Sequence, residues 1–160
     1  DYNKVRIAKE LVKFNERCFV RLLGDMRSYN YVFDITPDFE EVQFRIRAID
    51  FDQQSYEGKK TLYMPQFFKE NYPLVKLVQD HLTLENIEQY QKEERVLIAR
   101  RSKSAHIRLN ALLMLMETDT ISLPEKVTQL AAELAEHYED DGFLGCDSMG
   151  AIVRRSIARL

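Results

Sequence analysis

Two short strand patterns joined by a turn constrain the fold of this chain more than any other feature. Residues 31–35 (Tyr-Val-Phe-Asp-Ile) form a short β-type run, and from 42 to 48 apolar side chains occupy every second position. Between the runs, Thr36-Pro37-Asp38 is typical of a turn, because proline presets φ and aspartate can bond back to the backbone. We therefore expect a β-hairpin closed around Pro37, with residues 30 and 50 at its open end.

Polar side chains flank the expected hairpin. Asp25, Arg27 and Asn30 precede the first strand, and Asp50 and Asp52 follow the second. Since a hairpin brings its two ends together, Asn30 and Asp50 should lie at one edge. Phosphoryl transfer requires one carboxylate that orients a hydroxyl, together with carboxylate and amide oxygens that hold Mg²⁺. This order of residues therefore favours a phosphotransferase site.

The same residues carry a family resemblance. Gly24-Asp25, then Arg27 and Asn30, and Ile49-Asp50-Phe51-Asp52 at the end of the second strand resemble the catalytic loop and metal motif of the protein kinase-like superfamily. The pattern looks closest to the aminoglycoside phosphotransferase and choline kinase branch. The resemblance is specific over residues 5–54 and concerns only the order of elements beyond them.

The resemblance implies an activity and a role for each residue. It implies transfer of the γ-phosphoryl group of ATP, with Mg²⁺, to a small-molecule or protein hydroxyl acceptor. Asp25 would be the catalytic base, and Arg27 would neutralise charge on the transferred group. Asn30 and Asp50 would hold the metal and the nucleotide phosphates, with Asp52 as a further metal ligand. Which acceptor is used, from antibiotic to sugar to protein, stays open.

The chain also departs from the family pattern. Leu23 stands two residues before Asp25, where the family usually has histidine. Nothing before Asp25 provides a glycine-rich phosphate loop or a strand lysine. We therefore expect residues 1–160 to form a single kinase-like C-lobe domain, with an N-terminal nucleotide-covering lobe upstream in the same polypeptide. A catalytically inactive pseudokinase-like scaffold, or an unrelated helical interaction domain, is the alternative.

Apolar periodicity predicts helices through most of the remaining chain. They cover residues 4–22, 65–82 as two pieces (65–71 and 73–82) separated at Pro73, 84–101, 105–116, 124–138 and 148–160. Ser122 and Glu125 look like a capping box around Pro124, and the run 112–116, apolar all round, predicts a helix in the middle of the core. The fold class is thus α+β and predominantly helical, with about six helices and a small hairpin.

Charge and composition limit the classes of binding partner that we expect. The net charge of −3 argues against nucleic acid or an anionic membrane as the main partner. A basic cluster over residues 95–103 fits a solvated helix face. No apolar run approaches the ~18 residues of a spanning helix. Cys18 and Cys146 form neither a metal motif nor a disulfide framework, which agrees with a cytoplasmic setting.

Overall fold

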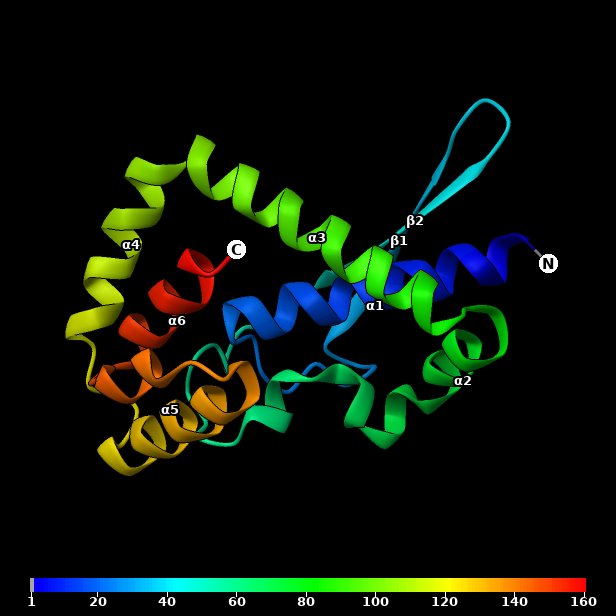
Figure 1. The fold of residues 1–160 in the computed structure, drawn as a ribbon. Helices are drawn as coiled ribbons and strands as arrows, with labels where there is room; N and C mark the ends of the chain where they lie inside the picture. The colour runs from blue at the N-terminus through cyan, green and yellow to red at the C-terminus, as the bar shows by residue number, and fades with distance from the viewer. Residues whose placement is uncertain (1) are drawn as a thin grey trace.

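The computed structural model describes residues 2–160, and helices make up most of it (Figure 1). The α-helices are α1 (Tyr2–Arg21), α2 (Tyr72–His81), α3 (Leu84–Ser104), α4 (His106–Thr118), α5 (Pro124–Tyr138) and α6 (Met149–Ala158). The strands are β1 (Tyr31–Pro37) and β2 (Val42–Ala48), and the 3₁₀ turns are η1 (Lys60–Tyr63), η2 (Pro65–Phe67), η3 (Lys69–Asn71) and η4 (Asp141–Gly145). The predominantly helical α+β class with a small sheet is confirmed. No helix within residues 2–160 combines the length and apolarity that crossing a bilayer requires.

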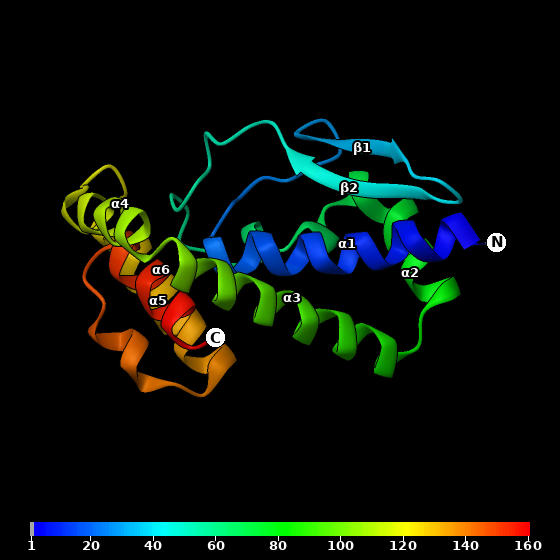
Figure 2. The same cartoon turned by 90° about the horizontal axis from the view of Figure 1, so that it is seen from above.

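The predicted hairpin is present, but the predicted turn at residues 36–38 is wrong: Thr36 and Pro37 are the last residues of β1, and residues 38–41 form the turn. β1 and β2 are antiparallel, with Tyr31 opposite Ala48 and Pro37 opposite Val42. The hairpin lies along α1 (Figure 2), and Ile46 is the buried centre of the β2 face that meets the helix. The alternation of apolar residues along β2 is therefore the cause of its orientation.

α1 contributes to both hydrophobic clusters of the described chain. Its middle packs Leu11, Phe14 and Cys18 against the hairpin and α2. Its C-terminal end packs Phe19 into a second cluster built mainly from α5, η4 and α6. Because α1 is packed on several sides, the start of the loop that follows it is fixed in position.

Two details of the helical prediction are wrong. Residues 65–71 form the turns η2 and η3 and no α-helix, because Phe68 between them is extended, with φ −83° and ψ 129°. Ser122 does not cap α5, whose N-cap position is Leu123 with no side-chain bond. The Ser122 hydroxyl donates to the backbone carbonyls of Tyr56 at 2.9 Å and Ser55 at 3.3 Å. It ties the start of α5 to the segment that follows β2.

The prediction that residues 112–116 lie in the middle of the core is also wrong. α4 packs mainly against α6, and Figure 1 shows it at one edge of the molecule. Leu113 is buried there, whereas Leu112, Met114 and Leu115 are exposed. A helix packed on one face leaves the rest of its surface in solvent, whatever its sequence.

Candidate functional site

The loop between α1 and β1 turns tightly around Asp25. The φ of Asp25 is 57°, a left-handed conformation that aspartate adopts more readily than most residues. Its backbone N–H donates to the Leu62 carbonyl at 3.1 Å, and its carbonyl accepts the Arg27 N–H at 2.8 Å. The turn holds the Asp25 side chain partly exposed, where a ligand can approach it.

Three of the five predicted site residues are in direct contact. Arg27 Nε donates to Asp25 Oδ1 at 2.6 Å. Asn30 Nδ2 donates to the Asp25 carbonyl at 2.7 Å and lies 3.4 Å from Asp25 Oδ2. The bond to Asp25 raises the pKa of Arg27 above its ordinary value, so the guanidinium stays charged. The cluster therefore has a carboxylate, a cation and an amide whose oxygen is left over as an acceptor.

Asp50 and Asp52 belong to the same end of the hairpin but do not bond to this cluster. The Ile49 N–H donates to the Asn30 carbonyl at 3.0 Å, which places residue 50 directly after the partner of Asn30. Asp50 Oδ1 accepts the Asp52 N–H at 3.0 Å. Within residues 2–160, no hydrogen bond or ion pair joins either carboxylate to Asp25, Arg27 or Asn30.

A short backbone bridge fixes the segment after β2 to the loop before Asp25. Leu23 and Gln54 form an antiparallel bridge, and the Gly24 N–H donates to the Gln53 carbonyl at 3.1 Å. A Cβ on Gly24 would lie 2.8 Å from that carbonyl oxygen, so only glycine permits this approach. The bridge couples the position of Asp50 to the position of Asp25.

Backbone strain is concentrated at this bridge. Leu22, Asp25 and Ser55 are three of the four non-glycine residues with positive φ among residues 2–160. For leucine the left-handed region costs about 1–2 kcal/mol. Such strain persists only where surrounding contacts impose it, and it gathers at functional sites. Here the Ser55 N–H donates to the Leu22 carbonyl at 2.7 Å and locks the pair.

Asn71 is a positioning residue that the sequence analysis missed. Its side chain is fully buried, and Nδ2 donates to the carbonyls of Met26 and Pro65, both at 2.8 Å. Its Oδ1 accepts the Tyr31 hydroxyl at 2.7 Å. Burial raises the pKa of Tyr31 to about 12, so the hydroxyl remains a donor at neutral pH. One amide thus links the loop, β1 and η2, and nothing local distinguishes Asn71 from a surface turn residue.

Glu70 also contacts the site and was not predicted. Its Oε1 lies 3.3 Å from Arg27 Nη1, and the Arg27 guanidinium stacks over the Phe68 ring at 4.5 Å. Its own backbone N–H, followed by the charge of Arg27, lowers the pKa of the Glu70 carboxyl. Arg27 is therefore held from three sides and does not reorient freely.

A buried ion network connects α1 and α3 to strand β2 of the hairpin. Arg17 donates to Glu10 at 2.6 Å and lies 3.4 Å from Glu94, which is 2% exposed. Arg17 also donates to the Ile46 carbonyl at 3.1 Å, and Glu10 accepts the Ile46 N–H at 2.9 Å. The i, i+4 and i+7 spacing of Glu10, Phe14 and Arg17 on the inward face of α1 was a signal for it.

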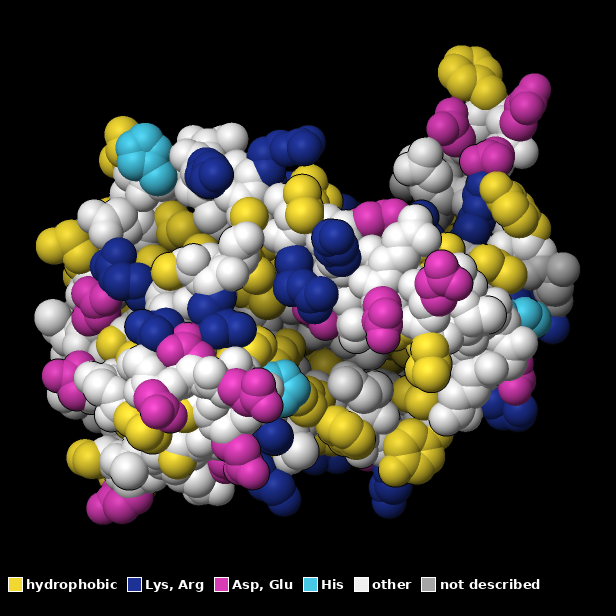
Figure 3. All heavy atoms as spheres, in the orientation of Figure 1, with side chains coloured by type: hydrophobic (Ala, Val, Ile, Leu, Met, Phe, Trp, Pro, Cys, Tyr) yellow, Lys and Arg dark blue, Asp and Glu magenta, His cyan; other side chains and the backbone are white. Residues whose placement is uncertain are grey.

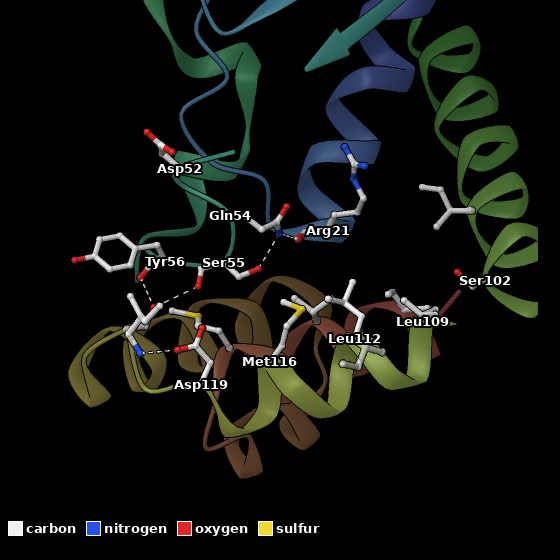
Figure 4. Close-up of a pocket in the computed structure, with 17 residues that line it drawn as sticks. Arg21, Asp52, Gln54, Ser55, Tyr56, Ser102, Leu109, Leu112, Met116 and Asp119 are labelled. Carbon is white, nitrogen blue, oxygen red and sulfur yellow. Dashed lines mark hydrogen bonds between the residues drawn. The ribbon is translucent and has the colours of Figure 1, made fainter. Parts of the chain in front are cut away.

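A cavity lies beside the segment that follows Asp50. Its volume is about 530 Å³, within the range of small-molecule sites. Figure 4 shows Gln54 and Ser55 on one side, with Leu109, Leu112 and Met116 of α4 on the other. Asp52 is at the rim, with its carboxylate turned away from these residues (Figure 4). Asp25 and Asn30 are not among the lining residues.

The donor atoms at the open end of the hairpin suit Mg²⁺ better than a softer metal. Among residues 2–160, no three His, Cys, Asp or Glu side chains gather closely enough to form a metal site. Asn30 and Asp50 offer one amide oxygen and one carboxylate. Mg²⁺ accepts such hard oxygens, keeps several waters and completes its shell with substrate phosphates.

Comparison of the chain with protein-family models, with curated proteins and with solved structures found no match in any of the three. The kinase-like resemblance of residues 24–52 therefore stays a prediction. It depends on the motif and on the contacts described above.

Proposed function

We propose that this chain is the catalytic lobe of a Mg²⁺- and ATP-dependent phosphotransferase that phosphorylates a hydroxyl group. One observation carries the proposal. Asp25 and Asn30 are in direct contact at the open end of a hairpin whose second strand leads into Asp50. This order and the Asp25–Asn30 contact support the roles of base and amide ligand, with Asp50 proposed as the carboxylate ligand that phosphoryl transfer requires.

The side chains have distinct roles in the proposed reaction. The acceptor hydroxyl binds beside Asp25 and gives its proton to a carboxylate oxygen. The hydroxyl oxygen bonds to the γ-phosphorus of ATP as the bond to the bridging oxygen breaks, and ADP leaves. Asn30 and Asp50 would hold the Mg²⁺, whose charge offsets that of the phosphates. Asp52 is at most a peripheral ligand, because it is exposed.

While Asp25 accepts the hydroxyl proton, Arg27 would neutralise negative charge on the transferred phosphoryl group. It already pairs with Asp25 and Glu70, so its geometry is preorganised before a substrate arrives. Asp25 retains acceptor capacity, since each carboxylate oxygen has two lone pairs. The proposal includes a nucleotide-covering lobe from the same polypeptide. It also includes a cytoplasmic setting, with which the free thiols of Cys18 and Cys146 agree.

A catalytically inactive scaffold with the same shape is the second candidate. Leu23, at the position where the kinase-like family usually has histidine, is fully buried in the cluster below the hairpin. The close Arg27–Asp25 ion pair also occupies one oxygen of the proposed base. These features favour a module that keeps the fold of the site for binding alone.

Calorimetric titration of Mg²⁺·ATP tests the proposal. The protein would be the chain together with any upstream part of its polypeptide, compared with Asp50→Ala. Asp34→Ala is the matched control, because Asp34 is a carboxylate of the same hairpin that pairs with Arg47 on the exposed surface. We expect Mg²⁺-dependent binding that Asp50→Ala abolishes and Asp34→Ala leaves unchanged.

A second variant separates the enzyme from the scaffold. Asp25→Asn should keep nucleotide binding and lose phosphoryl transfer to any acceptor that the wild type uses. Nucleotide binding without transfer by the wild type would favour the scaffold. No Mg²⁺·ATP binding by the wild type would refute the kinase proposal.

A further inference from the structure

The segment from α3 into α4 has a charge distribution unlike that of the whole chain. Residues 95–116 contain Arg95, Arg100, Arg101, Lys103 and Arg108 and no Asp or Glu, although the chain carries a net charge of −3. Positive charge is therefore gathered in one stretch, and the remaining chain is more acidic than the total indicates.

The structure leaves most of this positive charge unpaired. Arg95 pairs with Glu16 at 3.2 Å. Arg100, Arg101, Lys103 and Arg108 are exposed, and none of them has an ion pair among residues 2–160. Figure 1 shows the turn between α3 and α4 at an outer corner of the molecule. Four cations thus face solvent around one convex corner.

The outward side of α4 beside these cations is apolar. Ile107, Met114 and Leu115 are 74%, 58% and 71% exposed, and with Ala111 they follow the helical spacing of one face. The opposite side packs Leu113 into the core. Figure 3 shows hydrophobic, histidine and basic side chains at this corner, in the upper left of the view. We call these four cations and the outward face of α4 the α4 corner.

We propose that the α4 corner binds the surface of an anionic lipid bilayer. An interfacial helix needs an apolar face that enters the boundary of the acyl chains and cations that meet the lipid phosphates. The α4 corner has both, on a convex surface that a flat bilayer can reach. A second copy of the chain is disfavoured, because an isologous contact would bring the same four cations together. Nucleic acid is disfavoured, because its backbone offers nothing for exposed aliphatic side chains.

The net charge of the chain does not oppose this inference. At physiological ionic strength the Debye length is about 8 Å, so a membrane responds to the charges nearest to it. The expectation drawn from the total of −3 treated the charge as evenly spread. Because positive charge is concentrated in residues 95–116, that assumption does not hold.

Vesicle cosedimentation tests the inference. The full chain is mixed with vesicles of phosphatidylcholine alone, or of phosphatidylcholine with phosphatidylserine. We expect binding only to the second, weakened as salt rises from about 0.1 to about 1 M and the Debye length falls from about 10 to about 3 Å. Each basic residue near such a surface strengthens partitioning about fivefold. The variant Arg100→Glu/Lys103→Glu should therefore bind at least about 30-fold more weakly.

Matched variants separate the α4 corner from general effects. Lys59→Glu/Lys76→Glu makes the same charge change at exposed positions elsewhere and should bind like the wild type. Ile107→Ser/Leu115→Ser should weaken binding, whereas Leu84→Ser, at a residue that is 79% exposed on α3, should not. Circular dichroism confirms that each variant is folded, which is expected because every substituted side chain is exposed.

The outcomes decide the inference. Loss of binding in both α4-corner variants, with binding retained in both controls, supports it. It is overturned if phosphatidylserine does not increase the binding of the wild type to vesicles, or if the control variants lose as much binding as the α4-corner variants. Binding to polyglutamate or RNA without binding to vesicles also overturns it and assigns the corner to an acidic macromolecule. None of these results depends on the phosphotransferase proposal.

Discussion

Asn71 offers the sharpest test of how the site is held. The variant Asn71→Ala removes two donated bonds and one accepted bond from a single, fully buried side chain. It leaves the Met26 carbonyl and the Tyr31 hydroxyl without a partner, whereas the Pro65 carbonyl still accepts the Phe68 N–H at 3.2 Å. Each buried polar group left unpaired costs about 1–3 kcal/mol. For these two groups we therefore expect the free energy of unfolding to fall by about 2–6 kcal/mol, a large part of the usual stability of a domain.

Tyr31→Phe serves as the graded comparison. It removes only the bond between the Tyr31 hydroxyl and Asn71 Oδ1 and keeps the aromatic ring that packs on Phe14. The expected loss is about 1–3 kcal/mol, since one polar atom of Asn71 stays unpaired. In the Asn71→Ala background the same change should have little further effect, because the bond is already absent.

Urea unfolding followed by circular dichroism measures these free energies. Hydrogen exchange adds a local readout, because the Met26 carbonyl that Asn71 binds is next to Asp25. Amides of residues 24–30 should exchange faster in Asn71→Ala under native conditions. A loss below about 1 kcal/mol, or a loss no larger than that of Tyr31→Phe, would contradict the idea that Asn71 organises the loop.

Two further predictions follow from the same structure. Gly24→Ala places a methyl group 2.8 Å from the Gln53 carbonyl oxygen and should destabilise the protein by about 1–3 kcal/mol in thermal unfolding, whereas Gly145→Ala, which meets nothing within 4 Å, should be near neutral. The hydrogen bond from Arg155 lowers the pKa of Asp140 from 3.8 to about 2, so its stabilisation is complete above about pH 4 and is lost as pH falls towards 2. Urea midpoints measured across this range should depend less on pH in Asp140→Asn than in the wild type; equal slopes would contradict the assignment.

The hairpin was predictable because its determinants are local. The Pro37-Asp38 pair between the two strand patterns and a period of two along β2 are properties of a few neighbouring residues, although Pro37 itself ends β1 and the turn begins at Asp38. Once the register was known, the common end of Asn30 and Asp50 followed from it. The predicted helices 84–101 and 148–160 begin within one residue of α3 and α6, whose N-caps Thr83 and Ser148 act through local hydrogen bonds.

Other parts of the site depend on residues that are distant in sequence. The burial of Asn71 and Arg17 comes from contacts with elements that lie far along the chain. Ser122 had the local signature of a helix cap, but it bonds to carbonyls more than sixty residues away. At Ser122, hydrogen bonds to carbonyls that are distant in sequence form in place of the local helix cap.

The amino-acid pattern was sufficient to predict the hairpin and the order of Asp25, Asn30 and Asp50 along it, because periodicity and turn chemistry act over a few residues. The strand register, and the way Asn71 and the Glu10–Arg17–Glu94 network hold the hairpin in place, depend on tertiary packing. It also decided that the apolar helix α4 lies at the edge of the molecule, beside unpaired cations. Apolar side chains require burial of some kind, but which neighbour buries them depends on how all the elements pack together.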